Sequence, residues 1–204
     1  MTEILNLPEH VVFDLDGTLI DIRRKYYAAY KECARGTPIP QSTYWRLKRA
    51  KKLPPSDAHF INTIESEKYL SLDTLFPFTE SCLKRLVKQR YILHLVSARR
   101  NATAGRKEVT RLGIAKFFTT IDIGHNGHDV VATKTAFINK QLLKGTDLAL
   151  IGDTEDDINA ARELGGVSVA VTSGIRNKTY LARFSPDVIV PSINGLLDFA
   201  KKHR

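Results

Sequence analysis

Six short apolar runs, rich in valine and isoleucine, alternate along the chain with segments of helical periodicity. The runs are "VVFDL", "YILHLVSA", "FFTTIDI", "DLALIGD", "VSVAVTS" and "PDVIVPS". The helical patterns cover about residues 80–88, 102–112, 133–144, 155–164 and 194–201. Strands that alternate with helices form largely parallel sheets with helices on both faces. We therefore predict a Rossmann-like, doubly wound, mainly parallel α/β fold.

The gap between the first two runs, residues 21–78, is much longer than one crossover helix. It is polar and carries two helical patterns, "RRKYYAAYKECARG" and "SDAHFINTIESEKYL", with prolines at the turns between them. We expect residues 21–78 to form a small α-helical cap domain. Residues 1–20 and 79–204 then form the α/β core domain.

The composition is that of an ordinary globular protein with one hydrophobic core: 204 residues, 43% hydrophobic and 26% charged. The two cysteines, Cys33 and Cys82, match no disulfide framework or thiolate metal site. The apolar runs are of strand length and the N-terminus lacks the pattern of a signal peptide. We expect a cytoplasmic monomer or homodimer with no membrane partner.

The formal net charge of +9 favours an anionic partner, which is a nucleic acid, a membrane surface or a small substrate. The densest basic run, "WRLKRAKK" at residues 45–52, has one aromatic residue and no recognisable nucleic-acid-binding module around it. It is more typical of a solvated helix face. A small anionic substrate is therefore the leading expectation, and a nucleic-acid-binding scaffold is the minority one.

Polar residues stand where three predicted strands end and where one predicted helix begins. They are Asp14, Asp16, Ser97, Arg99, Lys134 and Asp153. In open parallel sheets, ligands collect at the carboxyl ends of the strands. We expect these side chains to converge on one site.

The chemistry of this set points to phosphoryl transfer. The acids of "DLD", Asp14 and Asp16, oppose each other's ionisation and call for a cation, and carboxylate oxygens suit Mg²⁺ together with phosphate. Ser97 and Lys134 are suited to hold phosphoryl oxygens. An ionised aspartate attacks phosphorus to give an acyl phosphate, and a second acid moves the protons.

Four motifs in order resemble those of the haloacid dehalogenase-like (HAD) hydrolase superfamily: "DLDGT" at 14–18, "LVSAR" at 95–99, Lys134, and "GDTEDD" at 152–157. The insertion follows the first motif, where that superfamily carries its type 1 helical cap. The resemblance covers the whole core. It implies the phosphatase branch, because dehalogenases and phosphonatases of the superfamily lack an acid at the position of Asp16.

The resemblance also implies a role for each motif residue. Asp14 is the nucleophile and a Mg²⁺ ligand, and Asp16 is the general acid and base and binds Mg²⁺ through its main-chain carbonyl. Asp153 is the third ligand, Asp157 orients Lys134 or a metal-bound water, and Ser97 and Lys134 secure the phosphoryl group. Apart from the resemblance, we expect Thr18 and Arg99 to contact the substrate. Arg99 and Arg100 are suited to a second anionic group of the substrate.

Some of these residues also fit other roles. Lys140 is a second lysine near the third motif, but Lys134 is preferred because it precedes the predicted helix. The segment "GDTEDDINAARELGG" also reads as a well-capped helix, with Thr154 as its cap. His125 and His128 lie in a glycine-rich stretch without a third soft ligand, which favours a loop over a metal site.

The segment after the first strand contains two further patterns. A calcium loop beginning at Asp14 requires glycine and glutamate where Leu19 and Lys25 stand, so that reading fails. Arg23, Arg24 and Lys25 follow the first motif and either line the site's entrance or form helix surface. We expect at least two of them to be surface residues, because adjacent helical positions point in different directions.

These inferences predict a Mg²⁺-dependent phosphatase that acts on a small phosphorylated metabolite through an aspartyl-phosphate intermediate. Two alternatives stay open. A sugar-phosphate mutase of the same superfamily keeps the same motif residues, and its cap decides the outcome. A basic nucleic-acid-binding protein would use the fold only as a scaffold, because a fold does not determine a function.

Overall fold

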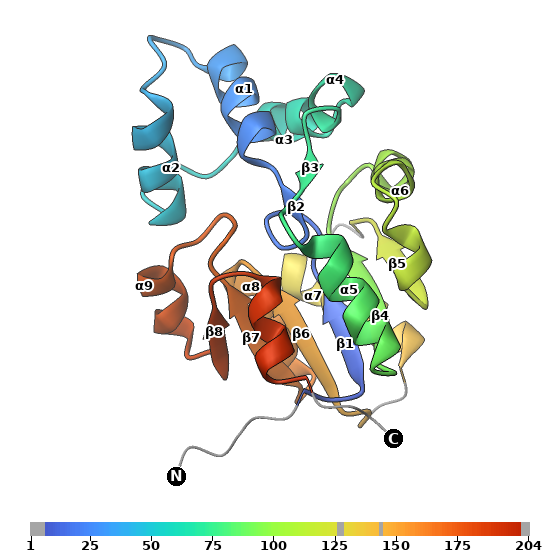
Figure 1. Ribbon diagram of the computed structural model, residues 1–204. Helices are drawn as coiled ribbons and strands as arrows, with labels where there is room; N and C mark the ends of the chain where they lie inside the picture. Colours follow the sequence, from blue (N-terminus) through green and yellow to red (C-terminus); the bar gives the residue numbers. More distant parts are fainter. Residues whose placement is uncertain (1–6, 126–128, 143–144, 201–204) are drawn as a thin grey trace.

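The computed structural model describes residues 7–125, 129–142 and 145–200. Its centre is a parallel sheet in the order β5-β4-β1-β6-β7-β8 (Figure 1). The strands are β1 (His10–Phe13), β4 (Ile92–Ser97), β5 (Thr120–Ile123), β6 (Leu148–Gly152), β7 (Val167–Val171) and β8 (Val188–Val190). All six come from the predicted apolar runs, and each pair of neighbours is parallel. The predicted fold class is confirmed.

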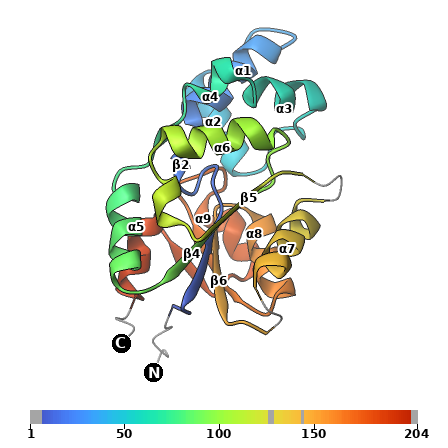
Figure 2. The same ribbon diagram turned by 90° about the vertical axis from the view of Figure 1, so that its right-hand side faces the viewer.

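Helices cover both faces of this sheet (Figures 1 and 2). On one face lie α5 (Thr79–Lys88), α6 (Ala102–Arg111) and η3 (Ile193–Asp198); on the other lie α7 (Val130–Gln141) and α8 (Glu155–Glu163). Side chains of β1 alternate between the faces, so Val11 and Phe13 join the core under α5 while Val12 joins the core under α7 and α8. Burial on both faces explains why the central strands are apolar at most of their positions.

Four helices between the first two strands of the sheet form a separate layer above its carboxyl edge, which we call the cap (Figure 1). They are α1 (Arg23–Cys33), α2 (Gln41–Arg49), α3 (Ala58–Ile64) and α4 (Glu67–Leu70). A small core that includes Ala29, Phe60 and Tyr69 holds α1, α3 and α4 together. A short antiparallel pair, β2 (Ile20–Asp21) and β3 (Thr74–Leu75), links the cap to the sheet. The exact domain boundaries stay a prediction.

Several helix limits differ from the expected ones. The pattern at 133–144 begins earlier, at Val130, because the Asp129 side chain accepts a hydrogen bond from the Ala132 N–H and caps the helix. The second cap pattern is broken into α3 and α4 between Ile64 and Glu67. The pattern at 194–201 forms a 3₁₀ helix, η3, in place of an α-helix.

Three remaining short elements complete the chain: η1 (Ala115–Phe117), α9 (Lys178–Leu181) and η2 (Ala182–Phe184). Within the described residues, no helix has the length and apolar character needed to cross a membrane.

Candidate active site

The carboxyl ends of β1, β4 and β6 meet below the cap at a pocket of about 290 Å³. The chain first extends the sheet from β1 to β4 and β5, and then returns to place β6 on the other side of β1. Such a reversal opens a crevice at the strand ends, where ligands bind in sheets of this type. The lining includes all six polar residues singled out in the sequence, which are Asp14, Asp16, Ser97, Arg99, Lys134 and Asp153.

Lys134 connects two of the acids. Its Nζ donates to Asp14 Oδ1 at 2.6 Å and forms an ion pair with Asp157. Asp157 also accepts hydrogen bonds from the backbone N–H and the hydroxyl of Thr154, at 3.1 and 2.7 Å, and so caps α8. The expected helix cap at Thr154 is therefore present, and of the two partners expected for Asp157, Lys134 or a metal-bound water, the structure shows Lys134. The Thr18 hydroxyl lies 3.3 Å from Asp14 Oδ2, to which it donates.

Asp153 is fully buried beside them, with one oxygen left over. Oδ2 accepts the Ile175 N–H, whereas Oδ1 is buried without a hydrogen-bond partner among the described residues. Gly17 and Gly174 pack against this carboxylate so closely that a Cβ at either position would overlap it. An unpartnered buried carboxylate oxygen is costly, which points to a cation at this position.

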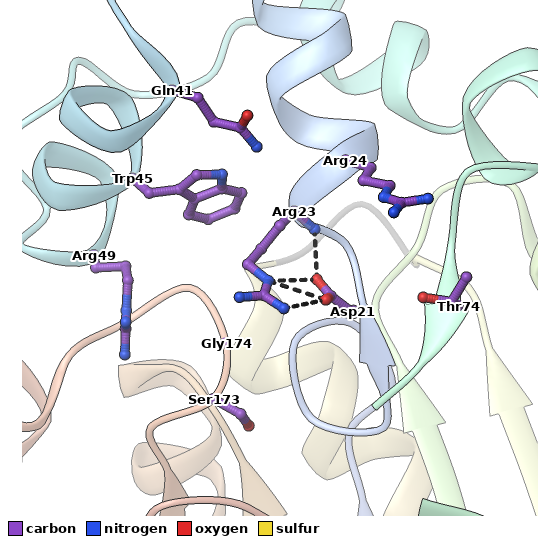
Figure 3. Close-up of a pocket in the computed structure, with 9 residues that line it drawn as sticks. All are labelled: Asp21, Arg23, Arg24, Gln41, Trp45, Arg49, Thr74, Ser173 and Gly174. Atoms are coloured by element: carbon purple, nitrogen blue, oxygen red, sulfur yellow. Dashed lines mark hydrogen bonds and ion pairs between the residues drawn. The ribbon is translucent and has the colours of Figure 1, made fainter. Parts of the chain in front are cut away.

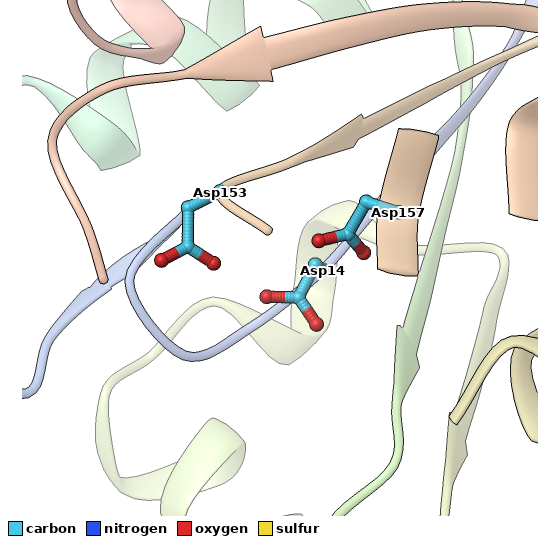
Figure 4. Close-up of side chains that lie close together, drawn as sticks. All are labelled: Asp14, Asp153 and Asp157. Atoms are coloured by element: carbon cyan, nitrogen blue, oxygen red, sulfur yellow. The ribbon is translucent and has the colours of Figure 1, made fainter. Parts of the chain in front are cut away.

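Three buried carboxylates lie close together: Asp14, Asp153 and Asp157 (Figure 4). Together with Lys134 they form a group that we call the acidic cluster. Ligand oxygens of the three carboxylates lie within 4.8 Å of one another. Burial raises the pKa of Asp14 to about 7, against the attraction of Lys134, and burial with the neighbouring Asp14 and Asp157 raises the pKa of Asp153 well above its ordinary value. Lys134 thus pairs with two of the three buried carboxylates, Asp14 and Asp157. Oxygen donors in this arrangement fit Mg²⁺.

Asp16 points to different partners. Arg99 donates to both of its oxygens, from Nε at 2.5 Å and from Nη2 at 2.7 Å, and Lys25 Nζ lies 3.1 Å from Oδ1. Burial opposes ionisation of Asp16, but Arg99 and Lys25 outweigh it and hold the pKa of this carboxyl well below its usual range. In this arrangement Asp16 is a carboxylate.

The same two cations continue into a second buried group, which we call the cap–core cluster: Asp16, Lys25, Asp73, Arg99 and Glu108. Lys25 Nζ donates to Asp73 Oδ2 at 2.5 Å, and Arg99 pairs with Glu108 and lies 3.4 Å from Asp73. Lys25 belongs to α1 of the cap and Glu108 to α6 of the core. The cluster therefore ties the cap to the sheet edge.

These contacts refine several expectations. Arg23 and Arg24 are exposed, as expected for at least two of the three basic residues, whereas Lys25 is buried. Arg99 lines the pocket, but its guanidinium is already bound to acids, so its contact with substrate stays a prediction. Lys134 lies inside α7 and not before it. Lys140 is exposed on the same helix, away from the acids.

The sequence also supports predictions for Ser97 and for the two histidines, His125 and His128. Ser97 is buried at the end of β4 and lines the pocket. His125 is described and has an interaction, whereas His128 lies outside the described residues, so the predicted loop is not tested there.

The cap supplies pocket residues that the sequence did not single out. They are Tyr26, Lys48, Ile61, Ile64 and Glu65. The run "WRLKRAKK" was expected to be a solvated face, and Arg46 and Lys52 are indeed exposed, but Trp45 is buried and Lys48 faces the pocket. No sequence signal separates Lys48 from its basic neighbours.

A second pocket, of about 450 Å³, lies between the start of α1, helix α2 and the loop after β7 (Figure 3). Arg23 and Arg24 line this pocket and not the one that holds the acids. Inside it, Arg23 is bound to Asp21, and Arg49 donates to the Thr172 carbonyl across the cap–core boundary. It is separate from the catalytic candidates.

The family model for haloacid dehalogenase-like hydrolases matches residues 11–171 of the chain. Among curated proteins, a phosphoglycolate phosphatase from Vibrio cholerae is 23% identical, covering 92% of this chain and 95% of the relative. The pyrophosphatase PpaX of Oceanobacillus iheyensis is 25% identical, covering 92% and 94%. A haloacid dehalogenase-like hydrolase of known structure from Streptococcus pneumoniae shares the fold, with a TM-score of 0.75, 22% identity and 98% and 99% coverage. The chain belongs to the haloacid dehalogenase-like hydrolases, in their phosphatase branch.

Proposed function

We propose that the protein is a Mg²⁺-dependent phosphatase that hydrolyses a small phosphorylated metabolite through an aspartyl-phosphate on Asp14. The observation that carries this proposal is the acidic cluster, in which Asp14 is bound to Lys134 beside a buried Asp153 oxygen without a partner. The pocket, of about 290 Å³, has room for a small phosphorylated molecule. The names of the relatives, a phosphoglycolate phosphatase and a pyrophosphatase, also denote small phosphates.

In the first step, an Asp14 oxygen attacks phosphorus and the bond to the leaving oxygen breaks. Lys134 and Ser97 hold the phosphoryl oxygens, and Thr18 orients the attacking carboxylate through its hydroxyl. In the second step, water attacks the phosphoryl group, and Asp14 is released as a carboxylate. The ion would be held by the carboxylates of Asp14 and Asp153 and by the main-chain carbonyl of Asp16. When bound, Mg²⁺ neutralises charge on the phosphoryl oxygens.

Asp16 moves the protons of both steps. As a carboxylate it is ready to accept a proton from the attacking water, which is the second step. To protonate the leaving oxygen in the first step it must bind a proton, which Arg99 and Lys25 oppose where they now stand. We infer that the acid step requires Asp16 to move out of these contacts toward the substrate.

The test is hydrolysis of p-nitrophenyl phosphate by the purified protein. Activity should require Mg²⁺, stop on addition of EDTA, and fall at least about 10³-fold in Asp14→Asn, because the amide is not a nucleophile. Asp147→Asn, an exposed acid in the loop before β6, is the matched control and should keep full activity. Activity that survives in Asp14→Asn with Mg²⁺ present would contradict the assigned nucleophile.

The same assay separates the mutase alternative. A phosphatase releases inorganic phosphate in step with the alcohol, whereas a mutase returns the phosphoryl group to another hydroxyl of a sugar phosphate. We expect stoichiometric inorganic phosphate.

A further inference from the structure

Lys48 lies on the cap side of the acid-lined pocket, on helix α2. Its amino group is 5.1 Å from the centre of the Tyr26 ring and 5.7 Å from that of Phe60. Its one hydrogen-bond partner among the described side chains is the Ser56 hydroxyl, at 3.4 Å. All of these partners are neutral, so the charge of Lys48 is not compensated by them.

The other basic residues that line this pocket are each paired. Lys134 binds Asp14, Lys25 binds Asp73, Arg99 binds Asp16, and Arg176 binds Glu155 at 2.8 Å. Within the described part of the chain, no carboxylate lies within 4.0 Å of the Lys48 amino group. Lys48 is thus the basic residue of the pocket that is left to meet a negative charge from outside the protein.

The surroundings of Lys48 add to this contrast. Burial, with the nearby Arg176 charge, lowers the pKa of Lys48 to about 8, so the group is still a cation at neutral pH but poorly hydrated. The cap side of the same pocket also presents Tyr26, Ile61, Ile64 and Glu65. The pocket therefore holds Asp14 and Lys134 from the core, and a lysine without a carboxylate partner among the described residues, beside mainly apolar side chains from the cap.

We propose that Lys48 binds a second anionic group of the substrate, so that the enzyme selects small phosphomonoesters that also carry a carboxylate or a second phosphate. The inference rests on the proposed phosphatase function, because it assumes that the reacting phosphoryl group lies at Asp14 and Lys134. Lys48 acts as a specificity residue and takes no part in bond breaking.

The experiment compares two substrates of one shape: carboxymethyl phosphate and its neutral amide, carbamoylmethyl phosphate. With Mg²⁺, Lys48→Met should lower kcat/KM for the carboxylate about 10- to 100-fold, mainly through KM, because a hydrogen bond to a charged group is lost. The value for the amide should change less than about threefold. Lys48→Arg should restore much of the preference. Inorganic pyrophosphate, as a third substrate, shows whether a phosphate replaces the carboxylate.

Lys52→Met is the matched control, because Lys52 is an exposed lysine four residues further on. It should leave both substrates unchanged, and activity on the amide shows that each variant is folded. Equal kcat/KM for both substrates in the wild type, or an equal loss for both in Lys48→Met, would overturn the inference while leaving the phosphatase in place. Absence of hydrolysis of either substrate and of p-nitrophenyl phosphate by the wild type would instead reject the proposed function.

Discussion

Two buried groups of charges adjoin each other under the cap, and they are compensated in different ways. In the acidic cluster, Lys134 pairs with Asp14 and Asp157, and an oxygen of the neighbouring Asp153 has no partner among the residues that the structure describes. In the cap–core cluster, three acids face two cations, and burial raises the pKa of Asp73 to about 8. Asp73 is then largely protonated at neutral pH, so Asp16 and Glu108 balance Lys25 and Arg99.

This difference separates a site that needs a ligand from a junction that does not. The cap–core cluster reaches charge balance with its own residues and positions the cap, although Asp73 Oδ1 also lacks a hydrogen-bond partner in the described part of the chain. In the acidic cluster, the raised pKa values of Asp14 and Asp153 mean that their ionised forms lack such compensation, which a bound cation would supply. Buried charges are retained at a considerable desolvation cost in both places. We expect the functional site to lie where the protein's own residues do not offset this desolvation cost.

The largest effect is expected when the acidic cluster loses its lysine. Lys134→Met should lower kcat about 10²- to 10³-fold with Mg²⁺ present, because the phosphoryl oxygens lose a fixed cation in a buried site. Lys140→Met, an exposed lysine of the same helix, is the control and should be near wild type. Steady-state kinetics on p-nitrophenyl phosphate measure both. A large loss in Lys140→Met alone would reverse the assignment of the motif lysine.

The cap–core cluster should respond in stability. Arg99→Met leaves Asp16 and Glu108 without their main partner, and breaking a buried ion pair in this way costs about 3 kcal/mol of the free energy of unfolding. Lys116→Met, which breaks an exposed pair with Glu80, should cost less than about 1 kcal/mol. Urea denaturation gives both values. Similar small losses in the two variants would show that the cluster does not hold the cap.

Mg²⁺ should distinguish the clusters directly. At about 100 times its Kd, Mg²⁺ should raise the free energy of unfolding by about 2.7 kcal/mol, because it binds only the folded protein. Asp153→Asn, in the acidic cluster, should abolish the increase, and Glu108→Gln, in the other, should keep it. Thermal unfolding with and without Mg²⁺ provides the measurement. An undiminished increase in Asp153→Asn would place the ion elsewhere.

The acidic cluster was largely predictable, and the cap–core cluster was not, for a physical reason. Asp14 and Asp153 follow strands whose apolar pattern is clear, and parallel strands bring their carboxyl ends together whatever the details of packing. Lys134 was recognised through its place among ordered motifs. Asp73 and Glu108, by contrast, meet Lys25 and Arg99 only because the cap packs on the core in one particular way.

Lys48 shows the same limit within a single helix. Residues 45–52 read as one basic stretch, and helical spacing alone does not tell which side faces a pocket when both sides carry charges. The outcome, with Arg46 exposed and Lys48 facing the pocket, depends on where α2 lies relative to Tyr26 and Phe60.

The smallest effect concerns Lys48, which belongs to neither cluster and should gain or lose its proton independently of them. Because its pKa is lowered to about 8, Lys48 is charged below that pH and loses its proton above it. The KM for carboxymethyl phosphate should therefore rise about tenfold from neutral pH to pH 9, where about one molecule in ten keeps the charge. Arg176 and Tyr26 face Lys48, and the pKa of Tyr26 is raised well above its ordinary value, so this phenol does not lose its proton in this range.

The ratio of KM for carboxymethyl phosphate to that for its neutral amide isolates this titration. Protons on Asp14, whose pKa is raised to about 7, affect both substrates alike and cancel in the ratio. Lys48→Arg should keep the ratio flat to pH 9, because arginine does not lose its proton. A wild-type ratio that is equally flat would mean that Lys48 does not meet the second anion, and the cap would then owe its selectivity to shape alone.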